Sequence, residues 1–471
     1  MKGYGISRIG QNKGAPRIWL EGHKPARGGF TPGVHYTIAV DASKSLLTLE
    51  VVESGVRIVS GKKRGTKEVP VIDINSKELL SMFEGYDSVR VVFQDQKIFI
   101  LPVASELRAK ERLERLKQKL QAGEVLQTGS ISTGVGVLDQ AAHKGLAQAG
   151  IKSRLAFANE IRDDCMEHAV EHNSVFDKDT ILLTAPMQEL AFDEYAMAQL
   201  PKVDIFCSGL PCSGASIAGR TKNKIAHPEA HEHVGHLVVA FLAIIAKVSP
   251  AAIVFENVPP YKTSASADII RNQLRDLGYI IHETELNSAD WGMLEHRKRL
   301  CMVAVTRGIS FSFDDLVLPE KMDLRVGDIM DAVDPEHSTW GSIDYLWKKR
   351  DRDAAEGKGF APTVVDENSI KVPTLNKTLH KKQSTGTFFR HPTKANFYRI
   401  PTVTEHARIK GIDEALAKDT TQTFGHEIFG QSICVPPFVS VFELLGHSLQ
   451  AFARSSMTSS VANPLMERIA A

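Results

Sequence analysis

This sequence has few cysteines, almost no net charge and no long apolar run. Its 471 residues include only five cysteines and carry a formal net charge of +1. The cysteines lack the paired spacing of a zinc site or a disulfide framework, which indicates a reducing compartment. A nearly neutral chain has no overall field that attracts polyanions, so any nucleic-acid contact must come from local patches. The five cysteines are Cys165, Cys207, Cys212, Cys301 and Cys434.

No apolar run has the length of a membrane span. The longest, Leu237–Val248, is shorter than the roughly 20 residues that a spanning helix needs, and predicts a buried core helix. The N-terminus has no signal-peptide pattern, so a cytoplasmic protein is expected. Hydrophobic residues make up 43% and charged residues 24% of the chain, as in globular proteins, and the length allows two or three domains.

Residues 1–102 predict a β-rich N-terminal accessory domain. Short β-branched and aromatic runs, separated by turn residues, predict strands at 17–21, 35–40, 46–52, 56–60, 89–93 and 97–101. Residues 15–60, with Arg17-Ile-Trp-Leu-Glu-Gly22 and Gly29-Phe-Thr-Pro-Gly33, resemble the swapped-hairpin modules of AbrB-type and SymE-like proteins. The resemblance implies a nucleic-acid-binding or dimerising module. The alternative is a β-rich extension packed on the main domain.

Two charged segments lie within or directly after this N-terminal region. Gly61–Lys67 is a basic hairpin tip, expected to be solvated, with phosphate contact as the alternative. Residues 103–124 predict a connecting helix, which Ser105 can cap and Gly123 can end. Its narrow leucine stripe leaves a coiled-coil dimer seam as an alternative, so a homodimer through this helix or the N-terminal domain stays open.

From about residue 125 the pattern alternates between strand and helix. Strand-like runs lie at 154–158, 203–207, 252–256, 279–282 and 300–305, with helical patterns between them. This order predicts an α/β fold with a doubly wound, mostly parallel sheet and helices on both faces.

Cys212 lies just past the strand predicted at 203–207, after a turn marked by Gly209 and Pro211. Reacting groups gather at the carboxyl ends of strands in such sheets, and a thiolate attacks electrophilic carbon well. Cys212 is therefore a candidate nucleophile. The alternative is a small buried apolar side chain.

A glycine turn, Ser132–Gly136, precedes a helical pattern at 138–149. Gly134 and Gly136 let the backbone approach a ligand, and the helix N-terminus favours negative charge. Glu160 follows the next predicted strand, where a carboxylate can bind both hydroxyls of a ribose. These residues predict a nucleoside-containing cofactor. The alternative is a tight strand–helix turn.

Charged side chains lie at the end of one further strand pattern and at the entry to another. Glu256 follows an apolar strand at the same sheet edge as Cys212, where burial can raise its pKa. Arg297 and Arg299, two positions apart, can clamp a phosphate or polarise a carbonyl oxygen. The alternatives are structural ion pairs or a helix cap.

In this order, Pro211-Cys212-x-x-x-Ser216, Glu256-Asn257-Val258 and Glu295-x-Arg297-x-Arg299 resemble the cytosine-5 DNA methyltransferases. Arg399–Gly411 and Gly430–Pro437 are similar to the last two blocks of that family, so the match runs from about residue 128 to 450. The resemblance implies a Rossmann-like fold dependent on S-adenosylmethionine. It also implies double-stranded DNA as partner and a flipped-out cytosine as substrate, because the reacting atoms are unreachable inside a duplex.

The resemblance also implies residue roles. Cys212 would attack C6 of cytosine, Glu256 would protonate or hydrogen-bond N3, and Arg299 would reach O2. Arg297 would contact a backbone phosphate, and Asn257 would orient the pocket. The loop after Cys212, with Ser216 and Arg220, would close over DNA. The cofactor-binding candidates are Gly134, Gly136, Glu160, Pro211 and Ser432. The family's Asp that contacts adenine has no clear match near residue 185.

Residues 310–395 break the strand–helix rhythm and carry many basic and polar side chains, including Lys381 and Arg390. The resemblance implies a target-recognition region here that reads bases in the major groove. The alternative is a surface insertion. The catalytic domain would then comprise residues 125–309 and a return segment, 396–471.

Three alternatives remain open at this point. The histidines of His227–His236 could ligate a metal, but their spacing is interrupted and no metal is expected. An RNA (tRNA) cytosine-5 methyltransferase would use the same catalytic residues. A non-catalytic DNA-binding regulator would keep the fold without turnover. A restriction-modification role and an orphan role are equally compatible with the sequence.

Overall fold

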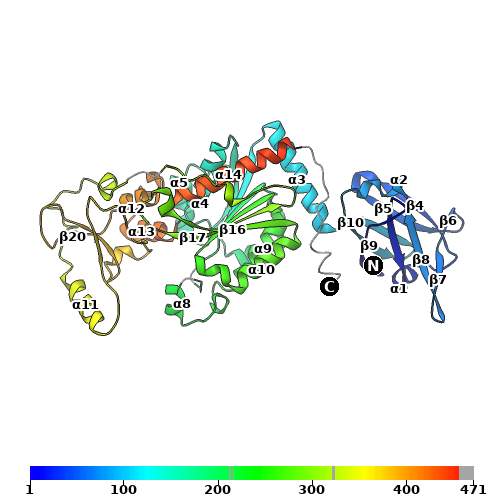
Figure 1. The fold of residues 1–471 in the computed structure, drawn as a ribbon, viewed down its shortest axis with the longest axis horizontal. Coiled ribbons are helices and arrows are strands. Elements are labelled where there is room, and N and C mark those ends of the chain that lie inside the picture. Colours follow the sequence, from blue (N-terminus) through cyan, green and yellow to red (C-terminus); the bar gives the residue numbers. More distant parts are fainter. Residues whose placement is uncertain (212–213, 216, 321–323, 456–471) are drawn as a thin grey trace. The chain divides into compact units, whose positions relative to one another are not determined.

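The computed structural model describes residues 1–211, 214–215, 217–320 and 324–455, which form two compact units (Figure 1). The first unit comprises residues 1–111 with 275–278, and the second comprises residues 112–274 with 279–455. Each unit has a hydrophobic core of its own, one among residues 18–100 and one among residues 113–452.

A seven-stranded sheet organises the second unit, in the order β13-β12-β11-β14-β15-β17-β16. The first five strands in this order are parallel, and β17 lies antiparallel between β15 and β16. The central strands are buried along most of their length, which explains their continuous apolar sequences. The strands are β11 (Leu126–Ile131), β12 (Ser153–Asn159), β13 (Ile181–Leu183), β14 (Ile205–Gly209), β15 (Ala252–Asn257), β16 (Tyr279–Asn287) and β17 (Lys298–Thr306).

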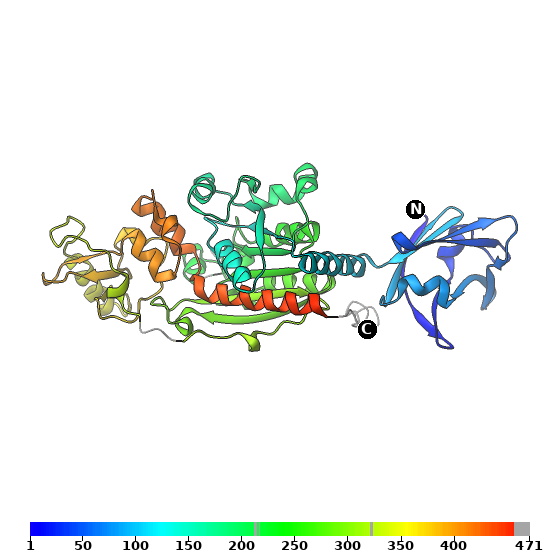
Figure 2. The same cartoon turned by 90° about the horizontal axis from the view of Figure 1, so that it is seen from above.

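Helices cover both faces of this sheet, as Figures 1 and 2 show. The mostly parallel sheet with flanking helices confirms the predicted Rossmann-like α/β fold, and Leu237–Val248 is the predicted core helix, α9. The helices of the second unit, whether they lie on the sheet or beside it, include α4 (Val137–Gln148), α5 (Asp163–His172), α6 (Met187–Phe192), α7 (Glu194–Gln199), α8 (Ile217–Asn223), α9, α10 (Ala265–Asp276), α12 (Val403–Lys410), α13 (Gln422–Gln431) and α14 (Val435–Arg454).

Helix α14 comes from the end of the described chain and packs on α4. A Cβ at Gly145 of α4 would come within 2.3 Å of the Val439 carbonyl oxygen, and one at Gly446 of α14 would come within 2.5 Å of Ala149 Cβ. Two glycines therefore allow the helices to approach closely. This packing brings the start of α14 beside the first βα unit of the sheet.

Helix α3 (Ala104–Ala122) has its leucine stripe inside the chain. Leu113 and Leu116 are buried in the core of the second unit. Arg115 fastens the same stretch by donating to the carbonyl oxygens of Val203 and Ser249, both at 2.8 Å. These leucines therefore pack inside the chain and are not available to form a coiled-coil seam with another copy.

The first unit repeats one arrangement twice. The elements β1-β2-β3-α1-β4-β5 and β6-β7-β8-α2-β9-β10 follow the same order, and their sheets read β1-β9-β10-β5-β4-β6 and β2-β3-β8-β7. Exchanging the equivalent strands leaves both orders unchanged. The central pairs have symmetric registers, such as Ile18 with Ile74 and Leu20 with Ile72. The unit therefore has an internal pseudo-twofold axis.

Five of the six strands predicted for residues 1–102 are present, and the run predicted at 56–60 is divided between β6 and the start of β7; the pattern of predicted strands did not indicate the repeat. The first half comprises β1 (Gly3–Arg8), β2 (Gly10–Asn12), β3 (Ala15–Glu21), α1 (His23–Arg27), β4 (His35–Asp41) and β5 (Leu46–Val52). The second comprises β6 (Arg57–Ile58), β7 (Ser60–Arg64), β8 (Lys67–Asn75), α2 (Lys77–Leu80), β9 (Ser88–Gln94) and β10 (Lys97–Pro102).

Residues 310–395 form a separate small sheet in the second unit together with the start of the return segment, which supplies its third strand. Strands β18 (Thr363–Val365), β19 (Thr387–Arg390) and β20 (Tyr398–Arg399) form it, and α11 (Asp344–Ala355) accompanies them. Two small apolar clusters stabilise this region, one around Phe388 and one around Phe389. In the described part of the chain no single helix is long and apolar enough to cross a membrane; α13 and α14 meet that criterion only together, bent by 43°.

Candidate active site

Glu256, Asn257 and Arg299 meet where β14 and β15 end. Glu256 is paired in register with Gly209, and Arg299 Nε lies 2.6 Å from Glu256 Oε1. A Cβ at position 209 would approach Glu256 Oε2 to 3.1 Å, so the glycine leaves room for the carboxyl group. Cys212 follows Gly209 by three positions in the sequence; Cys212 and Ser216 lie outside the described residues.

The carboxyl group of Glu256 is largely buried, with 15% of the side chain exposed. Burial raises its pKa above the ordinary value, and the cationic groups of Arg299, Arg297 and Lys410 oppose that rise without cancelling it. Glu256 therefore holds a proton more readily than an exposed glutamate does. Such a group can donate a proton or a hydrogen bond to a base placed beside it.

Asn257 connects the end of β15 to the chain just before Cys212. Its side chain is buried, and its Nδ2 donates to the carbonyl oxygen of Leu210 at 3.1 Å. Its Oδ1 accepts from the backbone N–H of Val258 at 2.9 Å. Asn257 thus positions the backbone two residues before Cys212.

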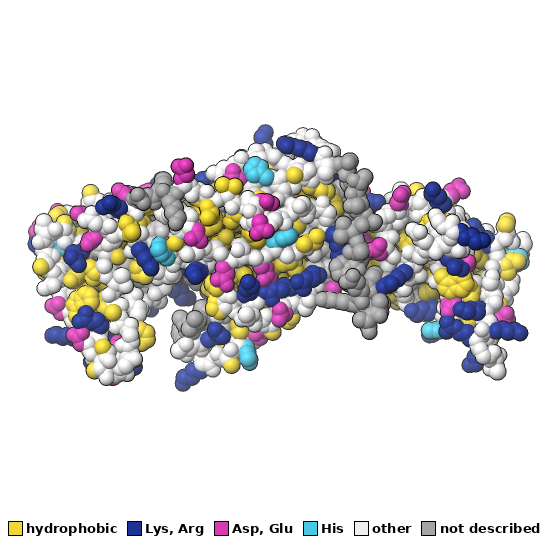
Figure 3. Space-filling view, viewed as in Figure 1, with side chains coloured by type: hydrophobic (Ala, Val, Ile, Leu, Met, Phe, Trp, Pro, Cys, Tyr) yellow, Lys and Arg dark blue, Asp and Glu magenta, His cyan; other side chains and the backbone are white. Residues whose placement is uncertain are grey.

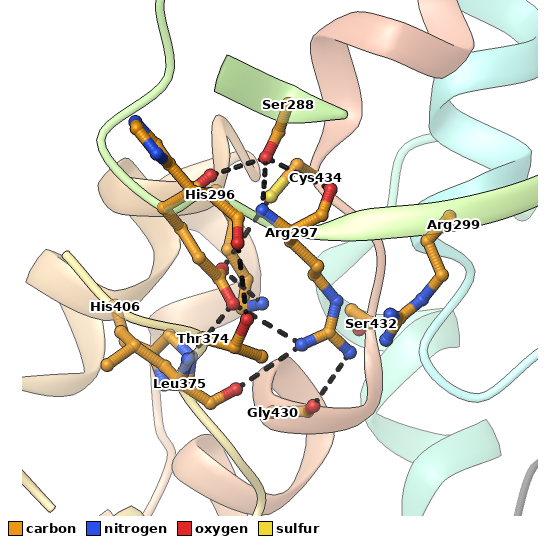
Figure 4. A network of polar contacts seen from close by, with 12 residues as sticks. Ser288, His296, Arg297, Arg299, Thr374, Leu375, His406, Gly430, Ser432 and Cys434 are labelled. Atoms are coloured by element: carbon orange, nitrogen blue, oxygen red, sulfur yellow. Dashed lines mark hydrogen bonds and ion pairs between the residues drawn. The ribbon is translucent and has the colours of Figure 1, made fainter. Parts of the chain in front are cut away.

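Arg297 is directed into the protein interior, unlike the phosphate-contacting residue expected from the sequence. Only 5% of the residue is exposed. Its Nη1 donates to Glu295 Oε1 at 3.3 Å and to the Leu375 carbonyl at 3.4 Å, and its Nη2 donates to the Gly430 carbonyl at 3.1 Å (Figure 4). Arg297 and Arg299 extend to the same side of the strand, yet only Arg299 reaches Glu256.

Glu295 is the centre of a buried charge network. Its Oε2 lies 2.5 Å from Lys410 Nζ and accepts a longer contact, 3.6 Å, from Cys434 Sγ, while its Oε1 accepts from Leu375 N–H at 3.0 Å. Burial opposes its ionisation, but the charges of Lys410 and Arg297 outweigh burial and lower its pKa. Burial, reinforced by Arg297, lowers the pKa of Lys410 to about 8. The network joins four segments that are distant in the sequence.

Three of the five predicted cofactor residues, Gly134, Gly136 and Glu160, lie together at the ends of β11 and β12. Glu160 Oε2 accepts from the backbone N–H of Gly134 at 2.8 Å, and its Oε1 accepts from the N–H groups of Ile161 and Arg162 at 3.0 and 3.2 Å. Three backbone donors therefore hold this carboxylate beside the glycine turn.

The two glycines of that turn have different reasons for being glycine. Both have positive φ, 59° at Gly134 and 77° at Gly136. A Cβ at Gly136 would meet Asn173 Nδ2 at 2.5 Å, whereas one at Gly134 would meet nothing within 4 Å. Gly136 is required by packing, and Gly134 faces open space in which a ligand could approach the backbone.

The four described cysteines are poor candidates for a nucleophile. All are buried. Burial raises the pKa of Cys165 to about 12 and that of Cys434 to about 11, and raises those of Cys207 and Cys301 as well. A thiol with such a raised pKa stays protonated at neutral pH and does not attack carbon. Among the five cysteines this leaves Cys212 as the candidate.

The sequence model of the family described as C-5 cytosine-specific DNA methylase matches residues 133–447. The chain belongs to this family.

Two bacterial relatives and one solved structure are similar to this C-5 cytosine methylase family member. The type II methyltransferase M1.ScrFI of Lactococcus lactis subsp. cremoris is 28% identical over 253 residues, which cover 52% of this chain and 62% of the relative. M.MspI of a Moraxella species is 27% identical over 265 residues, covering 55% and 59%. The chain thus matches about three fifths of the length of these relatives. The crystal structure of an S. pombe Dnmt2 methyltransferase has the same fold, with a TM-score of 0.52 at 17% identity, over 69% of this chain and 98% of that one.

The remaining predicted residues of this cytosine methylase family member are dispersed. Pro211 is exposed beside the Cys212 position, Arg220 is half-buried on α8, and Lys381 and Arg390 are exposed within the 310–395 region. Ser432 Oγ donates to the Ile428 carbonyl at 2.7 Å, at the end of α13. No group of three or more His, Cys, Asp or Glu side chains arranged to hold a metal occurs among the described residues.

Two site residues were missed by sequence reasoning. Asp139 is buried beneath the glycine turn, where Ser130 Oγ donates to its Oδ2 at 3.2 Å and burial raises its pKa to about 6. Its signal was a carboxylate within an otherwise apolar helix face. Lys410 lies on the buried face of α12, and a lysine among buried positions of the Arg399–Gly411 block was the corresponding signal.

Proposed function

We propose that this protein is a DNA cytosine-5 methyltransferase, which transfers a methyl group from S-adenosylmethionine to C5 of a cytosine flipped out of double-stranded DNA. The observation that carries the proposal is the Glu256–Arg299 pair, 2.6 Å apart and packed against Gly209, three positions before Cys212. The family and the type II methyltransferase names of the two relatives support the same reaction class.

The proposed reaction begins at Cys212, because C5 of cytosine is a poor nucleophile. The thiolate attacks C6, which forms a C–S bond and moves the electron pair of the C5–C6 double bond into an enamine-like ring. Glu256 donates a proton or a hydrogen bond at N3 and so relieves the negative charge, while Arg299 reaches O2. C5 then takes the methyl group. Loss of the C5 proton to a base restores the double bond and expels the Cys212 thiolate.

We assign the methyl donor to the glycine turn and its neighbours. S-adenosylmethionine supplies an electrophilic methyl group when it is bound. The residues fit its nucleoside part, because Glu160 presents a carboxylate for ribose hydroxyls and the space in front of Gly134 is open. The full set of proposed binding residues is Gly134, Gly136, Glu160, Pro211 and Ser432.

Asn257 and Arg297 act as positioning residues in this proposal. Asn257 holds Leu210, and through it the chain that leads to Cys212. Arg297 joins Glu295 to the Leu375 and Gly430 carbonyls, and stands two positions before Arg299. A role in holding the arginine strand thus replaces the phosphate contact for Arg297.

We assign DNA recognition to residues 310–395 and to the segment that follows Cys212. Lys381 and Arg390 are exposed and cationic, as phosphate or guanine contacts require. Ser216 and Arg220 belong to the segment expected to close over DNA. In this assignment the target-recognition region is inserted between the two parts of the catalytic domain, 125–309 and 396–471, as the resemblance to the family implies.

The test is methylation-sensitive sequencing of random duplex DNA after incubation with the purified chain and S-adenosylmethionine. We expect 5-methylcytosine at one recurrent motif, and none with Cys212→Ala. A duplex that contains 5-fluorocytosine in the same motif has no C5 proton to lose, so mass spectrometry should detect a covalent adduct at Cys212.

Other outcomes would reject the proposal in defined ways. Methylation of transfer RNA but not of duplex DNA would identify an RNA enzyme. Tight DNA binding by a folded chain that binds no S-adenosylmethionine would identify a regulator. Methylation at the wild-type rate by Cys212→Ala would rule out the covalent mechanism.

A further inference from the structure

The first unit has a basic arm that its fold does not require. The arm is the hairpin of β7 and the start of β8, and every residue of β7 is exposed. It carries four cations, Lys62, Lys63, Arg64 and Lys67. Residues 1–102 contain 15 Lys and Arg against 10 Asp and Glu, whereas the whole chain has a net charge of only +1. Positive charge is therefore concentrated in this unit.

Comparing the arm with its symmetry-related hairpin shows which part of the arm the fold uses and which part is additional. The pseudo-twofold counterpart of the arm is the hairpin of β2 and β3, which has three cross-strand pairs, from Gly10–Arg17 to Asn12–Ala15. The arm has the three equivalent pairs and two more, Lys63–Glu68 and Arg64–Lys67. These extra pairs extend into solvent and contribute nothing to the core. The core of the first unit is therefore complete without them.

The sheet fixes the arm in place and continues its positive face. Residues opposite each other in antiparallel strands share one face, which places Lys62 and Arg64 on the same face as Arg17 and Trp19. Glu21 accepts from Lys62 Nζ at 3.1 Å and from Trp19 Nε1 at 3.0 Å, and pairs with Arg64. In Figure 3, Lys and Arg side chains gather around an apolar patch over β7 and β8.

We propose that this arm binds the backbone phosphates of duplex DNA, as a second contact besides the catalytic unit. The partner follows from shape and charge. The major groove of B-form DNA admits a two-stranded β-ribbon, and exposed Lys and Arg neutralise its phosphates. Trp19 is 37% exposed, but the Arg17 guanidinium and Lys62 Nζ lie 4.4 and 5.8 Å from its ring centroid, so a single-stranded base that stacked on this ring would have to displace a cation. The inference rests on the proposed function, since its ligand is the duplex that the second unit would methylate.

The experiment compares two full-length variants that each lose four exposed cations of the first unit. The arm variant carries Lys62→Gln, Lys63→Gln, Arg64→Gln and Lys67→Gln. The matched control carries Lys2→Gln, Arg27→Gln, Lys44→Gln and Lys77→Gln, all exposed and outside the arm. Fluorescence anisotropy gives the Kd for a labelled 30-base-pair duplex at several KCl concentrations.

We expect the arm variant to bind the duplex at least about ten-fold more weakly than the control, with a salt slope smaller by about 2, because each phosphate contact contributes about 0.9 to that slope. Methyl transfer at saturating DNA should be unchanged. A second variant replaces residues 63–68 by Asn-Gly, which shortens the arm to the length of its counterpart. It should show the same loss of affinity while keeping the fold.

Equal affinities and salt slopes for the arm variant and the control would overturn the inference, while methylation by the wild-type chain would leave the proposed function standing. A wild-type chain that binds no duplex DNA would overturn both. Loss of affinity for structured RNA, with duplex DNA affinity unchanged, would also overturn it and identify RNA as the ligand of the arm.

Discussion

Glu256 is subject to two opposing influences. Burial favours its neutral form, and the Arg299 guanidinium 2.6 Å away favours its charged form. The upward direction of its pKa means that burial prevails. A proton donor balanced in this way suits a reaction in which negative charge develops on a bound base and is then lost again.

Replacing this carboxyl group should separate proton donation from binding. Glu256→Gln keeps the size of the side chain and an acceptor for Arg299, but it cannot transfer a proton. We expect methyl transfer to slow by a factor of about 10² to 10⁴, as for the loss of a general acid, with little change in DNA affinity. Single-turnover transfer of labelled methyl groups would measure this. Glu285→Gln, an exposed residue of β16, is the control, and an unchanged rate in Glu256→Gln would contradict the proposed role.

At the scale of elements, the buried charge network holds the turn before β17 to three other segments. Leu375 lies in the chain that returns from the 310–395 region, Lys410 ends α12, and Cys434 immediately precedes α14. The network contains two cations and one anion. The anion, Glu295, therefore compensates both Lys410 and Arg297, which makes the two sides of the ion pair unequal.

This inequality predicts different costs for neutralising the two partners. Glu295→Gln leaves two buried cations facing each other and should destabilise the second unit by about 3–5 kcal/mol, as for a broken buried ion pair. Lys410→Met should cost less, because Glu295 keeps Arg297 as a counter-charge. The double variant should recover much of the loss. Urea denaturation would measure all three, and equal costs for the two single variants would contradict this charge balance.

Asp139 should make the stability of the same unit depend on pH. Its pKa is raised to about 6 in the folded state, so the folded chain binds more protons than the unfolded chain between about pH 4 and 6. The contribution of Asp139 to stability therefore falls as pH rises through this range. A shift of about two pKa units corresponds to about 3 kcal/mol.

Asp139→Asn removes this titration and keeps an acceptor for Ser130. The difference in unfolding free energy, variant minus wild type, should grow in favour of the variant from pH 4 to 7, by at most about 3 kcal/mol. Denaturation curves at several pH values would measure it. A difference independent of pH would mean that Asp139 is not titrating in the folded protein.

At the scale of the molecule, the two units have separate cores. None of the buried residues in the core of the second unit comes from residues 1–102. A chain that begins at residue 103 should therefore fold and transfer methyl groups at saturating DNA, but with weaker DNA binding. Circular dichroism and methylation assays would test this. A folded but inactive truncation would mean that the first unit completes the catalytic site.

Much of the architecture follows from local patterns. Apolar runs that end at glycine or polar residues predict strands of a parallel sheet, because such strands are buried on both faces. The order of the motifs around Cys212, Glu256 and Arg299 was enough to identify the family. The repeat in the first unit has a weak sequence signal, since Pro16, Ile18 and Leu20 match Pro70, Ile72 and Ile74 but the positions between them, such as Trp19 and Asp73, differ, and the strand pairing is what relates the two halves.

Only the tertiary structure determined which partner each buried charge has. Spacing places Arg297 and Arg299 on one side of a strand, but the residues they meet come from positions 256, 375 and 430. Glu295 and Lys410 are 115 positions apart in the sequence, and their pairing appears only when α12 packs against the turn before β17. A buried charge needs a partner, and no local pattern names a partner that a distant segment supplies.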